Sequence, residues 1–285
     1  MAAQTLFNSI TGLKVRPRFC RAEGPSGLHR SPQRGETVEF SEYRPYAPGV
    51  ELRFVDWKLY ARCDRLFVKS FCDERASRFL IVLDDSPSMG YPLEGRTKWG
   101  LACELAMGLT YLAAQRQKDA VNIVTLSAIP AARLDEFRSF GSNLMELRKL
   151  ASAGAVRQGE WPIAGALSRM DLRRPTTVIF LSDLYEQPPA LMSLSRRGRR
   201  SGHEFWFLQI LSKEEIALPY ENLRNFIDVE SRQKIQLDPR TIQAHYSRAL
   251  HEHLSALRPL AAMGRFSMGI LGQDPAEILK RFLLD

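Results

Sequence analysis

FLIVLDD, at residues 79–85, is the stretch of this sequence that decides the fold. A continuous apolar run without alternating polar side chains is typical of a parallel strand that is buried on both faces. The run ends in two carboxylates, Asp84 and Asp85, where the chain must leave the sheet. A second stretch, TTVIFLSDL at residues 176–184, has the same form and also reaches a carboxylate, Asp183. We therefore predict a parallel sheet with acidic residues at the carboxyl ends of its strands.

Further strands alternate with helical patterns along the chain. We predict strands at residues 121–127, 203–211 and 265–271, and helices at residues 97–117, 143–151, 163–170, 239–263 and 275–283. Between the strand at residues 203–211 and the helix at residues 239–263, residues 225–238 read as two short runs joined by a turn. Strands that alternate with helices indicate an α/β fold, a doubly wound and mostly parallel sheet with helices on both faces. We assign this domain to residues 78–285.

Residues 1–77 have a different character. They contain GLHRSPQRGETVEFSEYRPYAPGV, which is rich in Gly, Pro, Ser and Arg, and short alternating runs such as TVEFSEYR. LFVKSF, at residues 66–71, is a further strand candidate, and no long helical pattern is present. This composition predicts strands and turns, so we expect a β-rich amino-terminal extension over residues 1–77.

The overall composition is that of a globular protein. The chain has 285 residues, of which 45% are apolar and 25% are charged. No run approaches the roughly eighteen consecutive apolar residues that a membrane helix needs. The first residues lack the pattern of a secretory signal, and the four cysteines show no metal-finger spacing. We expect a cytoplasmic protein with reduced thiols and no membrane span.

The net charge of +8 is concentrated in part in one cluster. The segment SRRGRR places Arg196, Arg197, Arg199 and Arg200 close together. Such a cluster can bind an anionic surface, and this function stays open as an alternative. No nucleic-acid motif accompanies it, and no aromatic residues interleave it as a single-strand platform requires. We interpret the cluster as a solvated helix end and expect no nucleic-acid partner.

The loop after the first strand carries the chemistry of the sequence. Its D-x-S-x-S spacing places Asp84, Ser86 and Ser88 on one tight turn, so that three oxygens can converge on one point. Asp183 follows the other acid-ended strand and can add a carboxylate from a neighbouring loop. Carboxylate and hydroxyl oxygens are the hard ligands that Mg²⁺ or Mn²⁺ prefers. These four residues are therefore the predicted metal site.

Enzyme signatures are weak by comparison. Ser86 and Ser88 lie on a strand-to-helix turn, but the glycines of the G-x-S-x-G nucleophile motif are absent. The five histidines show no H-E-x-x-H spacing, and the sequence has no phosphate-binding glycine loop. We predict no catalytic residues and a non-catalytic interaction module. The alternative from another class is a metal-dependent hydrolase that uses the same acidic turn.

The loop resembles the metal-ion-dependent adhesion site of von Willebrand factor A domains, and the wider chain resembles the bacterial family of unknown function called DUF58. The resemblance covers roughly residues 25–285. The most specific part of the resemblance is a block in the amino-terminal extension that precedes the loop. It consists of Arg44-Pro45-Tyr46, Gly49, Arg53, Asp56-Trp57-Lys58, Ala61-Arg62, Leu66, Val68-Lys69, Phe71 and Glu74. The segments FIDVES and QLDPR and the long helix with Tyr246 resemble the family's carboxyl-terminal half.

This resemblance implies a von Willebrand factor A fold, a divalent metal at the adhesion site, and a partner whose carboxylate completes the metal shell. It also implies a partner of the MoxR-type AAA+ ATPase class and an adaptor role in the maturation of other proteins. One departure concerns the fourth ligand, which is usually a threonine. It is expected near residues 158–163, where the chain reads QGEWPI and Glu160 is the available oxygen donor.

The charged and aromatic residues around Asp56-Trp57-Lys58, here called the DWK block, have two interpretations. In the first, Trp57 packs against the core while the charged residues pair with each other and hold the extension to the domain. In the second, the block lines a surface that receives a partner. The residues concerned are Arg53, Asp56, Trp57, Lys58, Arg62 and Lys69.

Overall fold

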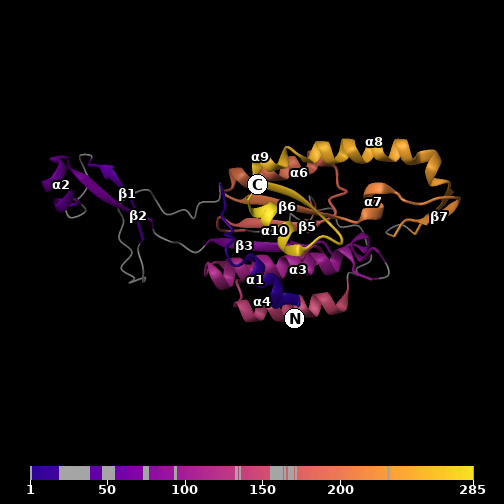
Figure 1. Ribbon diagram of the computed structural model, residues 1–285, viewed down its shortest axis with the longest axis horizontal. Helices are drawn as coiled ribbons and strands as arrows, with labels where there is room; N and C mark the ends of the chain where they lie inside the picture. Colours follow the sequence, from indigo (N-terminus) through magenta and orange to yellow (C-terminus); the bar gives the residue numbers. More distant parts are fainter. Residues whose placement is uncertain are drawn as a thin grey trace. The chain divides into compact units, whose positions relative to one another are not determined.

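A computed structural model of the chain describes residues 2–18, 39–46, 55–72, 77–92, 95–131, 134, 136–154, 163, 165, 170, 172–229 and 232–284. The chain divides into two compact units. The larger unit combines Met1–Ala22 with Ser77–Asp285, and the smaller unit is Glu23–Ala76. Figure 1 shows the elements of each unit along the chain.

A five-stranded sheet forms the centre of the larger unit. Its order is β4-β3-β5-β6-β9, and every neighbouring pair is parallel. The strands are β3 (Arg78–Leu83), β4 (Ala120–Thr125), β5 (Thr177–Ser182), β6 (Glu204–Leu211) and β9 (Arg265–Ile270). The acid-ended runs thus form the adjacent central strands β3 and β5, as their unbroken apolar sequences predict.

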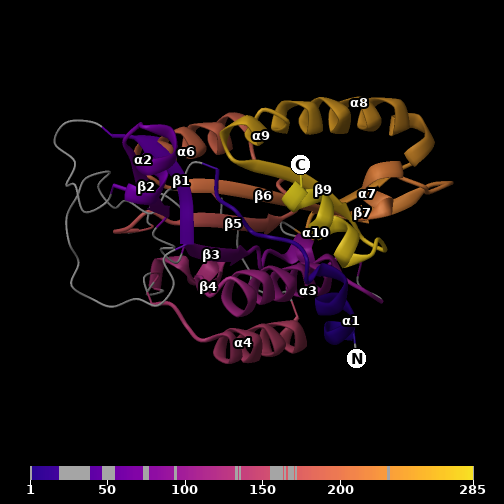
Figure 2. The ribbon, with the colours of Figure 1, turned by 60° about the vertical axis from the view of Figure 1, so that its left-hand side comes forward.

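Helices cover both faces of this sheet, and each face has its own core. One face packs against α1 (Ala2–Ile10), α3 (Lys98–Thr110), a π-helical turn η3 (Tyr111–Arg116), α4 (Phe140–Ala153) and α10 (Pro275–Leu284). The other packs against α6 (Pro188–Arg200), α8 (Pro239–Leu257) and α9 (Leu260–Met263). Figure 2 shows the two helical layers on either side of the strands. The predicted fold class, an α/β doubly wound parallel sheet, is confirmed.

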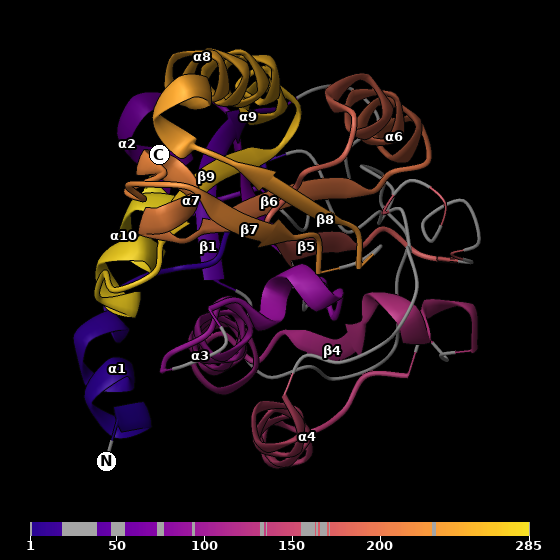
Figure 3. The same ribbon diagram turned by 90° about the vertical axis from the view of Figure 1, so that its right-hand side faces the viewer.

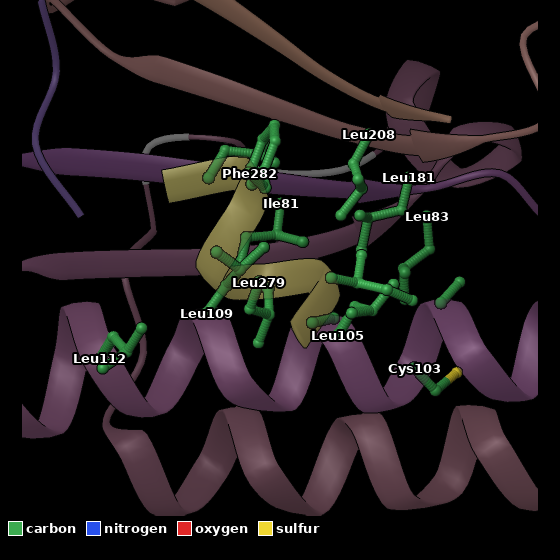
Figure 4. Packing of buried hydrophobic residues seen from close by; sticks show 14 of the residues in the cluster. Ile81, Leu83, Cys103, Leu105, Leu109, Leu112, Leu181, Leu208, Leu279 and Phe282 are labelled. Carbon is green, nitrogen blue, oxygen red and sulfur yellow. The ribbon is translucent and has the colours of Figure 1, made fainter. Parts of the chain in front are cut away.

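Successive residues of β3 point into opposite cores because strand side chains alternate. Ile81 and Leu83 belong to the core under α3 and α10, whereas Leu80 and Val82 belong to the core under α6 and α9. Figure 4 shows the first of these cores, where side chains of β3, β5 and β6 meet those of α3 and α10. Burial on both faces explains why these strands read as unbroken apolar runs.

The amino-terminal helix α1 differs from the expected extension over residues 1–77. Leu6, Phe7 and Ile10 are buried in the core under α3, and the Phe7 ring stacks on Tyr111 at 4.4 Å between centroids. The larger unit therefore includes the first residues of the chain. Because α1 has only nine residues, it is too short to be stable alone and becomes stable through this packing.

The predicted helix over residues 239–263 is wrong in its continuity. α8 ends at Leu257 and α9 begins at Leu260, with Pro259 between them. Proline has no N–H to donate and its ring clashes with the preceding turn, so the helix breaks there. Arg258 N donates to Ser255 O instead, at 3.3 Å. The predicted helix at residues 163–170 lies mostly outside the described residues.

Short elements gather at the carboxyl ends of the strands. They are the 3-10 turns η2 (Pro87–Gly90) and η4 (Leu126–Ala131), the helix α7 (Lys213–Ala217), and the hairpin of β7 (Arg224–Ile227) and β8 (Lys234–Leu237). In Figure 3, which views the molecule from this end, β7, β8 and α7 lie in front of the sheet. The hairpin agrees with the two short runs predicted at residues 225–238.

The smaller unit is a hairpin with one short helix. β1 (Glu39–Pro45) pairs antiparallel with β2 (Phe67–Cys72), with an irregularity between Phe40 and Glu42. α2 (Trp57–Cys63) lies in the connection between them and was not predicted. Across the described residues of both units, no helix is long and apolar enough to cross a membrane.

Candidate functional site

The site lies at the topological switch point of the sheet. From β3 the chain crosses to β4 on one side, while β5 lies against the other side of β3. In open parallel sheets, ligands bind outside the carboxyl ends of the strands at such a point. Asp84 follows β3 directly and Asp183 follows β5, so the structure places both predicted carboxylates at this point.

The D-x-S-x-S loop folds as the spacing predicts. The Ser86 N–H donates to Asp84 Oδ1 at 2.9 Å, and the hydroxyl oxygens of Ser86 and Ser88 lie 3.0 Å apart. Pro87 begins the turn η2, which fixes the backbone between the two serines. The other carboxylate oxygen of Asp84, Oδ2, accepts a hydrogen bond from Ser182 Oγ at 2.6 Å. Ser182 is a member of the site that sequence reasoning missed, although it directly precedes Asp183.

The surroundings of Asp84 disfavour the charged form of its carboxyl group. Burial raises the pKa of its carboxyl group above the usual value of 3.8, and the nearby carboxylate of Asp183 raises this pKa further. Hydrogen bonds from Ser182 and Ser86 oppose the shift without cancelling it. The charged form of Asp84 is therefore disfavoured until a cation comes close.

Asp183 has a cationic partner that the sequence did not reveal. Lys98 Nζ donates to Asp183 Oδ2 at 2.9 Å and to Glu215 Oε1 at 2.5 Å. The Lys98 side chain is completely buried. The other oxygen of Asp183, Oδ1, has no hydrogen-bond partner in the described part of the chain. Lys98 therefore contacts two carboxylates, and when all three groups are ionised one negative charge remains uncompensated. Asp84, whose carboxyl group interacts electrostatically with Asp183, adds a further negative charge nearby.

Asp85 is excluded from the site despite its position in the loop. Its carboxylate turns towards β4, where Oδ1 accepts from the Ser127 N–H at 3.1 Å and Oδ2 accepts from the Ser127 hydroxyl. Both aspartates are buried, but only Asp84 is hydrogen-bonded to Ser86, whose hydroxyl in turn contacts Ser88. Asp85 instead ties the loop after β3 to the end of β4, which makes it a natural control for Asp84.

The donor set fits a small divalent cation whose shell is built from hydroxyls and carboxylates. Among the described residues, no group of three or more His, Cys, Asp or Glu side chains is arranged to hold a metal. Asp84, Ser86 and Ser88 would supply the direct ligands, and the carboxylate of Asp183 is close enough to Asp84 to raise its pKa. Asp84 accepts hydrogen bonds from Ser182 and from the backbone and side chain of Ser86, and its two oxygens together still have a lone pair for a cation. Residues 158–162, with the expected fourth ligand and Glu160, lie outside the described residues.

The DWK block builds a local structure in the smaller unit. Buried Asp56 caps α2, accepting at Oδ1 from the N–H groups of Lys58 and Leu59, and its Oδ2 accepts from the Tyr43 hydroxyl at 2.9 Å. Trp57 is 55% exposed and touches Tyr60 edge to face, so it is not packed in a core within the described residues. Lys58 and Arg62 are exposed. Arg53 and the side chain of Lys69 lie outside the described residues.

The other predicted features lie apart from the site. Arg196, Arg197, Arg199 and Arg200 occupy the last turns of α6 and are exposed, as expected for a solvated helix end. Cations at a helix carboxyl terminus also complement the helix dipole, which gives these residues a structural reason to be there.

The raised pKa of Asp84 gives a testable sign. A group whose pKa is raised in the folded state contributes stability that is lost as the pH rises through that pKa. We expect Asp84→Asn to raise the stability of chelator-treated protein at pH 7 by about 1 kcal/mol, because the buried charge is removed and the shape is kept. The difference from the wild type should shrink as the pH falls towards 3.8. Thermal unfolding across this pH range measures it, and a less stable variant at pH 7 would contradict it.

Comparison with known proteins places the chain in a family. The family model described as "Protein of unknown function DUF58" matches residues 42–256, and the chain belongs to this family. Among solved structures, an aerotolerance-related membrane protein from Bacteroides fragilis NCTC 9343 is similar, with 14% identity and a TM-score of 0.45. The match covers 73% of this chain and 96% of that one. The conserved hypothetical protein BatB from Bacteroides thetaiotaomicron has 11% identity and a TM-score of 0.41, covering 74% and 100%. A search of curated proteins found no match.

Proposed function

We propose that this protein is a non-catalytic interaction module that captures a carboxylate of a protein partner through a divalent metal at Asp84, Ser86 and Ser88. The observation that carries the proposal is the convergence of these three side chains beside Asp183 at the switch point. A bound Mg²⁺ or Mn²⁺ would supply an open coordination position for the partner's carboxylate. The protein's own part is to hold the ligands, to bury their charge, and to present the loop at the surface.

Exposed apolar side chains beside the loop support a protein partner. Tyr185, Leu223, Ile227 and Ile235 are all exposed. The last three lie in residues 220–237, which contain the hairpin of β7 and β8 and are called the hairpin segment below. This segment is tied to the loop because the Tyr220 hydroxyl lies 2.7 Å from the Tyr91 hydroxyl, just after η2. Apolar residues around a polar centre are the composition expected of a protein-binding surface.

The surroundings of the two serines favour a non-catalytic role over a hydrolase. A nucleophilic serine needs a base within hydrogen-bond reach. The hydroxyls of Ser86 and Ser88 contact each other, Ser86 also contacts Asp84, and no histidine contacts either serine within the described residues. The metal-dependent hydrolase stays the alternative, and turnover of a generic ester or phosphate substrate that Asp84→Asn abolishes would favour it.

The partner we propose is a MoxR-type AAA+ ATPase in the cytoplasm, with this chain as an adaptor in the maturation of other proteins. This part of the proposal rests on family resemblance. Capture of the purified ATPase should require Mg²⁺ or Mn²⁺ and should fail with chelator. A contact made through the arginine cluster of α6 should instead weaken steeply as salt rises.

The first test is titration of Mg²⁺ and Mn²⁺ into chelator-treated protein by calorimetry. We expect saturable binding to the wild type and an affinity about 100-fold weaker or more in Asp84→Asn, because a charged ligand is lost. Asp85→Asn is the matched control, since it removes a neighbouring buried charge that faces Ser127 instead of the site. Equal binding to the wild type and Asp84→Asn would overturn the proposed metal site.

A further inference from the structure

Lys98 is a fully buried lysine at the amino-terminal end of a helix, next to the candidate site. It is the first residue of α3, its side chain is completely buried, and its ammonium group lies between Asp183 and Glu215. Lysine is almost never fully buried unless it is paired. A cation at a helix amino terminus is also opposed by the helix dipole. The two carboxylates, and not the helix, therefore determine where this ammonium group lies.

Glu215 is fixed from three sides. Its carboxylate accepts from the Ser212 N–H at 2.6 Å, its own N–H donates to Ser212 Oγ at 3.1 Å, and the Tyr246 hydroxyl of α8 donates to its carbonyl oxygen. This capping box holds Glu215 at the start of α7. Because Glu215 is anchored in this way, Lys98 is held beside Asp183, next to the Asp84 loop.

We propose that Lys98 is the resident cation of this site: it neutralises Asp183 when no metal is bound, and it competes with a divalent cation for that carboxylate. This inference rests on the proposed metal-dependent function. The ammonium group of Lys98 repels an arriving Mg²⁺ or Mn²⁺, and its hydrogen bond engages a lone pair of Asp183 Oδ2 that could otherwise bind the metal. The resting affinity for metal is then low, and the negative charge of a partner's carboxylate favours loading.

The test is titration of Mn²⁺ into chelator-treated full-length protein, comparing the wild type with Lys98→Met, which keeps the length of the side chain and removes its charge. We expect the Kd for Mn²⁺ to fall by about 10-fold or more. The melting temperature without metal should also fall, because the carboxylates lose their counter-ion, and Mn²⁺ should restore more of it than in the wild type. An unchanged or weaker affinity for Mn²⁺ in Lys98→Met would overturn the competition.

Glu215→Gln keeps the proposal testable if Lys98→Met does not fold. Glutamine retains the capping hydrogen bonds, and Lys98 is left with Asp183 as its charged partner. The Kd for Mn²⁺ should then rise about threefold or more, since Lys98 holds Asp183 more tightly. An unchanged or lower Kd would count against Lys98 as the competitor.

The outcomes also separate this inference from the proposed function. Saturable Mn²⁺ binding to the wild type that does not change in either variant leaves the metal site in place and overturns the role of Lys98. Binding that appears only in Lys98→Met supports Lys98 as the resident cation and shows that the resting protein does not hold metal alone. No binding to any of the three proteins overturns the metal-dependent function and, with it, the competition.

Discussion

Replacing Gly264 with alanine should unfold the larger unit or destabilise it by about 3 kcal/mol or more. Gly264 joins α9 to β9, and a Cβ atom placed there would lie 2.0 Å from the carbonyl oxygen of Phe205. The contacted atom is backbone of β6, the strand that pairs with β9, so it cannot move aside without breaking the sheet. The close passage of the chain from α9 into β9, against the backbone of β6, therefore requires glycine at position 264.

Gly141→Ala is the matched control for this substitution. Gly141 lies in α4, where an added Cβ would meet nothing within 4 Å, and alanine favours the helix. We expect this variant to be as stable as the wild type or more stable by up to about 1 kcal/mol. Urea unfolding followed by circular dichroism measures both changes. A Gly264→Ala variant as stable as Gly141→Ala would show that α9 and β6 are not packed as closely as described.

Replacing Asp56 with alanine should open α2 in the smaller unit. Asp56 accepts hydrogen bonds from Lys58 N, Leu59 N and the Tyr43 hydroxyl, so one carboxylate joins the helix to β1. Loss of the cap and of a charged hydrogen bond should destabilise the local structure by about 2 kcal/mol. Trypsin, which cuts after Lys58 and Arg62 when the helix opens, should then cleave there about 30-fold faster.

Asp56→Asn is the control in this case, because asparagine also caps helices and keeps a hydrogen-bonding group towards Tyr43. Its cleavage rate should stay within about threefold of the wild type. Mass spectrometry of the first tryptic fragments distinguishes cuts in α2 from cuts elsewhere. Equal cleavage rates for Asp56→Ala and Asp56→Asn would mean that the carboxylate does not hold α2 in place.

Several sequence expectations failed for reasons that lie outside local sequence. The helix α1 was missed because it has only nine residues and gains its stability by packing on α3 and α10. The exposure of Trp57 departs from the first interpretation of the DWK block, in which this tryptophan packs against the core, because burial of a side chain depends on contacts outside the local sequence. Part of the predicted site, the turn near Glu160, could not be compared because it lies outside the described residues.

Lys98 and Glu215 show the same limit within the candidate site. They meet across 117 residues of sequence, and Lys98 meets Asp183 across 85. One local signal was available, because a lysine at the first position of an apolar helix conflicts with the helix dipole. Such a conflict between local preference and position is expected at functional sites. It identifies the residue, but it does not identify the partners.

The sequence by itself determined the features that depend on neighbouring residues. Unbroken apolar runs specified the buried parallel strands, and the D-x-S-x-S spacing specified a loop whose Asp84, Ser86 and Ser88 converge. Only the tertiary structure decided which charges meet at this loop: Asp84 faces Asp183, Asp85 turns to Ser127, and Lys98 lies between Asp183 and Glu215. The physical reason is that strand and turn preferences act over a few residues, whereas the pairing of buried charges depends on strand order and crossovers, which bring distant segments to one edge of the sheet.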